Sequence, residues 1–116
     1  GSAKERELGE QIAAVAPVKN LCGRTTLADV VDLLGAADVA VSNDTGLMHV
    51  AAAAGASVVA IYGSSSPAFT PPLTAAASIV YAALECSPCF ERTCPLGHLR
   101  CLKNITAARV SAVRAA

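Results

Sequence analysis

The sequence predicts an α/β fold, in which a Rossmann-like parallel sheet carries flanking helices. Short runs of apolar and β-branched residues alternate with helical patterns along the chain, as in domains built from strand–helix–strand units. Two of these runs, Asp38–Ser42 and Ser57–Tyr62, are largely apolar, which is typical of strands buried on both faces of a parallel sheet. A length of 116 residues suits one domain.

The first expected elements are a helix and a strand. Ser2–Glu5 fits a capping box, and it precedes apolar side chains on one helical face at Leu8, Ile12, Val15 and Ala16. Pro17 ends this helix, because proline cannot continue the hydrogen-bond ladder. The apolar run Val18–Cys22, followed by Gly23, then predicts a short strand.

The central elements follow the strand–helix–strand pattern. Thr26–Asp29 is a second capping box, and it opens a helical stripe at Leu27, Val30, Val31 and Leu34. The strand Asp38–Ser42 leads into a turn at Asn43–Gly46. An Ala-rich helix is expected over Leu47–Ala54, with Gly55 as its stop.

The remaining elements complete a sheet of four expected strands. The strand Ser57–Tyr62 is followed by a loop, Gly63–Thr74, and by a strand at Ala77–Ala82. A Cys-rich segment occupies residues 86–101. Thr106 caps a last helix, whose buried side carries Val110 and Val113.

Composition excludes several classes of protein. Lys and Arg number 9 and Asp and Glu number 9, so the net charge is 0 and there is no basic field for nucleic-acid binding. The longest nearly unbroken apolar stretch, Val50–Tyr62, falls short of a membrane span. No signal-peptide pattern opens the chain, so we expect a cytoplasmic protein.

The hydrophobic core is thin for the length of the chain. Alanine occurs 25 times, and the aromatic side chains are 2 Tyr and 2 Phe without Trp. The first helix also begins at the first residues, with no strand before it. We therefore expect one domain over residues 1–116, truncated at its N-terminus, that completes its core with a missing part.

The turn after the strand Asp38–Ser42 carries the strongest chemical signal. A helix N-terminus presents free N–H groups and a partial positive charge, which suits a phosphate at Thr45 and Gly46. The carboxylate of Asp44 repels phosphate but can accept hydrogen bonds from sugar hydroxyls. The alternative role for Asp44 is a plain helix N-cap.

Other candidate ligand contacts are weaker when taken alone. His49 lies one turn into the same helix and can donate to a phosphate or hydroxyl, or else packs beside alanines. Lys4 lies at a helix start, where a cation opposes the helix dipole unless an anionic ligand binds there. The alternative is a solvated side chain. Ser64 and Ser65 follow a buried strand, but Gly63–Pro67 lacks the ending of a P-loop, so ATP hydrolysis has no support.

The cysteines form a second group of candidate residues. Four thiols occupy 16 residues, with His98 among them, at Cys86, Cys89, Cys94 and Cys101. Four thiolates, or three with the imidazole, would suit tetrahedral zinc. The spacing matches neither paired zinc ribbons nor ferredoxins, and the alternative is a thiol-rich loop that is reduced in cells. Cys22 stands apart as a small core residue.

Three segments together resemble the heptosyltransferases of glycosyltransferase family nine. They are Ser42–Ala53 (SNDTGLMHVAAA), Ile61–Pro67 (IYGSSSP) and the Cys-rich stretch Glu85–His98 (ECSPCFERTCPLGH). The first four residues resemble a turn that follows a strand in that family. The resemblance implies a partial C-terminal half of a GT-B glycosyltransferase, an enzyme with two Rossmann-like domains facing a cleft.

The resemblance also implies a reaction. Heptose would pass from ADP-heptose to the heptose of the lipopolysaccharide inner core, with inversion and without a required cofactor. Carried over, the donor-binding residues would be Lys4, Asp44, Thr45, Gly46, His49, Ser64 and Ser65. No catalytic residue is expected in this chain, because the family's base lies in the N-terminal domain, a further partner. Peripheral membrane association at the inner face of the inner membrane stays open.

Two alternatives differ in class from this reading. One alternative is another GT-B sugar-nucleotide transferase or an epimerase. A transfer assay of the full-length protein with ADP-heptose and with UDP-sugars would distinguish it from a heptosyltransferase. The other is a non-enzymatic interaction module stapled by Cys86–Cys101, which stoichiometric zinc without sugar-nucleotide binding would favour.

Overall fold

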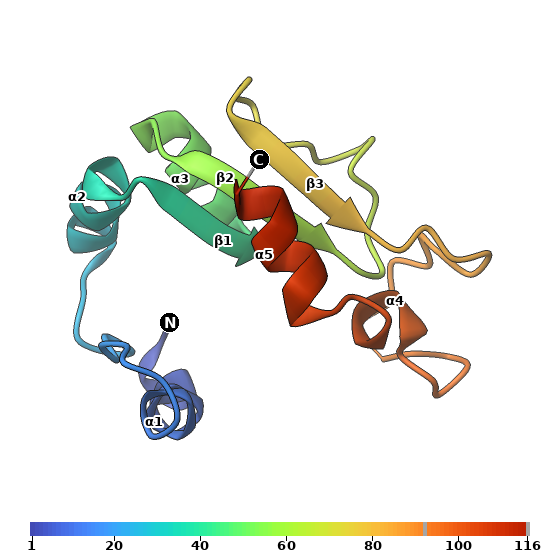
Figure 1. Cartoon of the computed structure of the whole chain (residues 1–116), viewed down its shortest axis with the longest axis horizontal. Coiled ribbons are helices and arrows are strands. Elements are labelled where there is room, and N and C mark those ends of the chain that lie inside the picture. Colours follow the sequence, from blue (N-terminus) through green and yellow to red (C-terminus); the bar gives the residue numbers. More distant parts are fainter. Residues whose placement is uncertain (92, 116) are drawn as a thin grey trace. The chain divides into compact units, whose positions relative to one another are not determined.

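The computed structural model describes residues 1–91 and 93–115. The chain divides into two compact units, Gly1–Leu33 and Leu34–Ala116 (Figure 1). The described residues form a short 3-10 helix, five α-helices and three strands. The α/β class predicted from the sequence is confirmed.

The first unit is a helix braced by a loop. A 3-10 turn at Ala3–Glu5 leads into α1, Arg6–Ala13, and the backbone N–H of Ser2 donates to Glu5 Oε2 at 2.8 Å. The amide of Asn20 donates to the Arg6 carbonyl at 3.0 Å and to Glu10 Oε1 at 2.8 Å. Polar contacts of this kind fix the loop on the helix.

Two expectations for this unit are wrong. The run Val18–Cys22 is not a strand, because the described residues of the unit contain no second strand with which it could pair; its backbone bonds locally instead, as when the Cys22 N–H donates to Asn20 Oδ1 at 3.0 Å. The helix is also shorter than expected and ends at Ala13. Its apolar face remains exposed at Leu8, Ile12 and Val15.

Helix α2, Leu27–Ala36, begins with the capping box that the sequence predicts. The Thr26 N–H donates to Asp29 Oδ2 at 2.9 Å, and the Asp29 N–H donates to Thr26 Oγ1 at 3.2 Å. Hydrogen bonding of the Asp29 carboxylate to the Thr26 backbone N–H, and to a lesser extent to the Thr26 hydroxyl, lowers the pKa of Asp29. The box therefore satisfies two groups at a helix end that would otherwise need water.

The second unit holds a three-stranded parallel sheet. Its strands are β1, Val39–Asn43, β2, Ser57–Tyr62, and β3, Ala77–Tyr81, in the order β1-β2-β3 (Figure 1). The register pairs Val39 with Ser57 and Asn43 with Ile61, so β1 and β2 end side by side. Parallel strands place their following loops at one edge, where open α/β sheets bind ligands.

Helices cover both faces of the sheet. Helix α3, Gly46–Ala54, packs on β1 and β2 and forms one core cluster with the sheet, made of Met48, Ala51, Ala52, Val58, Ala60 and Tyr62. On the other face lie the side chains of Val59 and Val80, both buried, and α5, Ala107–Ala115, packs on β3 and β2. Figure 1 shows α5 in front of the sheet and α3 behind it.

Two helix ends of this unit agree with their predicted caps. Gly55 ends α3 in the left-handed conformation, with φ of 94°. The Arg109 N–H donates to Thr106 Oγ1 at 3.1 Å at the start of α5, where Val110 and Val113 are half-buried as expected. A short helix, α4 at Arg100–Lys103, ends the Cys-rich segment and was not expected. Among the described residues, no helix has the length and apolar character that a membrane crossing requires.

Candidate functional site

Two loops lie at the carboxyl edge of the sheet. The turn after β1 contains Asp44 and Thr45, and the loop after β2 runs from Gly63 to β3. Since Asn43, the last residue of β1, pairs with Ile61, one residue before the end of β2, these two loops start next to each other. The sheet therefore brings together the turn that contains Asp44 and the loop that contains Ser64 and Ser65, both of which the sequence predicts to bind the donor.

A hydrogen bond joins the two loops. The hydroxyl of Thr70 lies 3.0 Å from Asp44 Oδ2, and it also lies 3.3 Å from the carbonyl oxygen of Ser66. The Thr70 N–H donates to that same carbonyl at 3.2 Å. Thr70 is thus held by the turn at Ser66 and in turn fixes one oxygen of the Asp44 carboxylate.

Tyr62 supports this contact from beneath. Its ring is fully buried at the end of β2, and its hydroxyl donates to the Thr70 carbonyl and approaches Met48 Sδ at 3.7 Å. Burial raises the pKa of Tyr62, and the negative charge of Asp44 raises it further. The buried phenol therefore stays protonated and keeps its donor role.

The N-cap of α3 is Thr45 and not Asp44. Thr45 has extended backbone angles, φ −145° and ψ 168°, and its side chain makes no capping bond. Asp44 lies one residue outside the cap, where its carboxylate bonds to Thr70. The interpretation of Asp44 as a plain N-cap is therefore wrong. The first amides of α3 have no side-chain acceptor from their cap residue and are available to an anion.

Space is open around the first residue of α3. A Cβ added to Gly46 would meet no atom within 4 Å. Gly46 is exposed, and Asp44 and His49 are half-buried, so none of the three residues is fully covered by packing. A ligand can reach the helix end, and only a hydrogen atom stands between it and the Gly46 backbone.

Ser64 lies against the Cys-rich segment, and Ser65 is half-buried in the same loop. The Phe90 N–H donates to the Ser64 carbonyl at 2.8 Å, and Ser64 lines a cavity of about 80 Å³ with residues of that segment. Gly63 lies against α4, since a Cβ there would come within 2.7 Å of Leu102 Cδ2. The Cys-rich segment thus packs on the loop that carries the two serines.

Lys4 is the one predicted donor-binding residue outside the second unit. It lies exposed in the 3-10 turn of the first unit, so its placement beside Asp44 stays a prediction.

The zinc alternative has no support in the structure. Within residues 1–91 and 93–115, no group of three or more His, Cys, Asp or Glu side chains is arranged to hold a metal ion. The five cysteines are free and half-buried.

Sequence reasoning missed Thr70 and Tyr62. Thr70 lies 26 residues beyond Asp44, inside a Pro-rich loop that carries no pattern indicating where its side chains point. Tyr62 ends an apolar strand and looks like an ordinary core residue. Only the pairing of β1 with β2 brings both near the carboxylate.

The fold and the site define a class of protein. A parallel sheet with an open helix N-terminus and a carboxylate at its carboxyl edge is a Rossmann-like domain suited to a ligand with phosphate and hydroxyl groups. The sequence model of glycosyltransferase family 9 (heptosyltransferase) matches residues 1–100. The chain belongs to this family.

Several relatives of this chain are type 2 heptosyltransferases. Lipopolysaccharide heptosyltransferase 2 of Salmonella typhimurium and that of Escherichia coli K12 are each 48% identical over 86 residues, 69% of this chain and 25% of theirs. Lipooligosaccharide heptosyltransferase 2 of Haemophilus influenzae is 43% identical over 86 residues, with the same coverage. The resemblance to the family-nine heptosyltransferases, predicted from three segments of the sequence, is confirmed.

A solved structure has a similar fold. ADP-heptose lipopolysaccharide heptosyltransferase II of E. coli superposes with a TM-score of 0.67 at 37% identity, over 97% of this chain and 35% of that one. The chain therefore spans about a quarter of the length of the relatives it matches and about a third of the solved structure.

Proposed function

We propose that the chain forms the donor-binding part of a heptosyltransferase and binds ADP-heptose at the carboxyl edge of its sheet. One observation carries the proposal: the open N-terminus of α3 and the carboxylate of Asp44 lie next to each other, both accessible to a ligand. An activated sugar needs this pair, because its diphosphate is anionic and its ring carries hydroxyl donors.

The diphosphate would lie at Thr45 and Gly46. The uncapped amides of α3 supply hydrogen-bond donors and a partial positive charge, and the empty space at Gly46 allows a close approach of phosphate oxygens. His49, one turn further along α3, would donate a hydrogen bond at the same end. This arrangement also stabilises the negative charge that develops on departing ADP.

The heptose ring would lie against Asp44. One carboxylate oxygen, Oδ2, accepts from the Thr70 hydroxyl, and the remaining acceptor positions would receive sugar hydroxyls. Charge-assisted hydrogen bonds of this kind are stronger than neutral ones. Ser64 and Ser65, from the loop after β2, would complete the donor site, and Lys4 would contact a donor phosphate.

The reaction would be a direct displacement at the anomeric carbon. A hydroxyl of the lipopolysaccharide inner-core heptose attacks that carbon, the bond to the ADP oxygen breaks, and the configuration inverts. The base that takes the hydroxyl proton would come from outside residues 1–116, in the N-terminal domain that faces this one. An acceptor anchored in lipid would place the reaction at the cytoplasmic face of the inner membrane.

The family match favours this function over a metal-stapled interaction module. Within the GT-B class it also favours heptosyl transfer over another sugar-nucleotide reaction.

The test compares two aspartates that flank β1. In the protein that contains this chain, Asp44→Asn keeps an oxygen for the Thr70 hydroxyl but removes the charge. Asp38→Asn makes the same change before β1, at the opposite end of the strand. We expect Asp44→Asn to lower kcat/KM for ADP-heptose about ten- to hundred-fold, as for a lost hydrogen bond to a charged group. Asp38→Asn should leave it unchanged. Equal effects of the two changes would contradict the proposal.

A further inference from the structure

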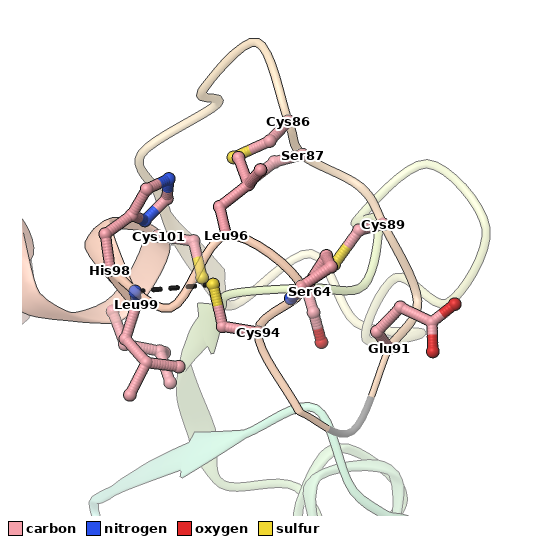
Figure 2. Close-up of a pocket in the computed structure, with 12 residues that line it drawn as sticks. Ser64, Cys86, Ser87, Cys89, Glu91, Cys94, Leu96, His98, Leu99 and Cys101 are labelled. Atoms are coloured by element: carbon pink, nitrogen blue, oxygen red, sulfur yellow. Dashed lines mark hydrogen bonds between the residues drawn. The ribbon is translucent and has the colours of Figure 1, made fainter.

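The Cys-rich segment forms a cavity beside the proposed donor site, and of the proposed donor-binding residues only Ser64 is in its wall. Its wall carries four thiols, at Cys86, Cys89, Cys94 and Cys101, together with His98, Glu91 and apolar side chains such as Leu96, Leu99 and Leu102. Figure 2 shows the side chains of Cys94 and Cys101 pointing toward one another in this cavity. Each thiol is free and half-buried, so small molecules can reach it.

The turn after Cys94 surrounds its sulfur with backbone donors. The Leu99 N–H donates to Cys94 Sγ at 3.5 Å, the bond drawn dashed in Figure 2, and the Gly97 N–H closes the turn on the Cys94 carbonyl at 3.1 Å. Gly97 and Leu99 have positive φ angles, 71° and 53°, which turn the backbone back over the sulfur. A nest of N–H groups stabilises an anion.

The electrostatics of the turn favour a thiolate at this position. The Leu99 N–H lowers the pKa of Cys94 most, and the N–H groups of Leu96, His98 and Gly97 lower it further against an opposing effect of burial. The thiolate is the form of cysteine that attacks disulfides. Cys94 is therefore the candidate for the attacking sulfur in this cavity.

We propose that Cys94 and Cys101 form a thiol–disulfide exchange site for low-molecular-weight disulfides, in which Cys94 is the attacking sulfur and Cys101 the resolving one. The Cys94 thiolate attacks one sulfur of R–S–S–R, the S–S bond breaks, and R–S⁻ leaves. The Cys101 thiol loses its proton to solvent and attacks the Cys94 sulfur, which expels the second R–S⁻. Two protein thiols are oxidised to one disulfide, and the small disulfide is reduced to two thiols.

The site has a physical connection to the loop after β2. Ser64 lines the same cavity and binds the Phe90 N–H, and Leu102, next to Cys101, lies against Gly63. A disulfide between Cys94 and Cys101 would hold the Cys-rich segment in one arrangement on the loop after β2. The exchange chemistry itself does not depend on the proposed heptosyltransferase function.

The test uses the aromatic disulfide 5,5′-dithiobis(2-nitrobenzoate) on the protein that contains this chain. We expect a fast phase that releases two thionitrobenzoates for each chain and leaves a disulfide between Cys94 and Cys101, mapped by peptide mass. Cys101→Ser should release one and retain the other as a mixed disulfide on Cys94. Cys94→Ser should lose the fast phase, and Cys22→Ser, a change in the other unit, should keep it.

A second measurement needs no variant. Limited alkylation of the reduced protein with iodoacetamide, followed by peptide mapping, should label Cys94 about ten-fold faster than Cys22, with the advantage growing below the ordinary cysteine pKa. Equal labelling of the two, a fast phase that survives Cys94→Ser, a bridge to Cys86 or Cys89, or stoichiometric bound zinc on the thiols would overturn the proposal.

Discussion

The hydroxyl of Thr70 lies 3.0 Å from Oδ2 of Asp44, across the gap between the two loops at the carboxyl edge of the sheet. The bond connects a residue that follows β1 with a residue that follows β2. Tyr62 holds the same threonine by its backbone carbonyl. The carboxylate proposed to face the sugar is therefore positioned by the core and not by its own turn alone.

Thr70→Val tests this positioning role. Valine keeps the shape of the side chain but cannot donate, so Asp44 would lose one fixed orientation. We expect kcat/KM for ADP-heptose to fall about two- to ten-fold, less than for loss of the Asp44 charge, because Thr70 orients the carboxylate and does not itself contact the sugar in the proposed site. Thr74→Val is the matched control, because Thr74 accepts from the Ala76 N–H in the same loop and makes no contact with Asp44. Transfer kinetics that fall equally in both variants would refute the role.

Local patterns predicted much of this fold. The Thr26–Asp29 capping box, the stop at Gly55 and the cap at Thr106 depend on residues within a few positions of each other, and all three are present. The apolar runs likewise predicted the strands β1 and β2, but burial on both faces is correct only for β2, because Val41 of β1 is exposed. Interactions of short range can be read from a sequence because the spacing fixes the geometry.

Long-range contacts could not be predicted in the same way. The run Val18–Cys22 has the composition of a strand, but strand formation requires a neighbour, and the described part of its unit offers none. Asp44 was identified from its place at a helix start, whereas its actual partner, Thr70, comes from a distant loop. The sequence located the charged residue but not the contacts that orient it.

Gly46→Ala separates ligand binding from stability. A methyl group there meets no protein atom, and alanine suits a helix better than glycine, so the free energy of unfolding should stay the same or rise by up to about 1 kcal/mol. The methyl would nevertheless occupy the space proposed for the diphosphate. We expect the KM for ADP-heptose to rise at least about ten-fold, which corresponds to roughly 1.4 kcal/mol.

Gly55→Ala, at the other end of α3, is the control for this change and should show the opposite pattern. Its φ of 94° strains any side chain, so unfolding should become easier by about 1–2 kcal/mol while the KM stays unchanged. Urea unfolding and transfer kinetics on both variants give the comparison. A normal KM for Gly46→Ala would remove the diphosphate from this helix end.

The buried phenol of Tyr62 should make the protein sensitive to alkaline pH. Burial and the charge of Asp44 raise its pKa above the ordinary value of 10.0, so the folded protein disfavours the phenolate that the unfolded chain forms freely. The contribution of the protonated Tyr62 to the free energy of unfolding is complete below pH 10.0 and is lost as the pH rises from there through the pKa of the folded state.

Tyr62→Phe tests this pH dependence. The free energy of unfolding should fall by about 1 kcal/mol at neutral pH, because the hydrogen bond to the Thr70 carbonyl is gone. In the alkaline range the variant should lose stability less steeply than the wild type. Urea midpoints measured across the range for both proteins give the slopes, and parallel slopes would show that Tyr62 does not titrate differently on folding.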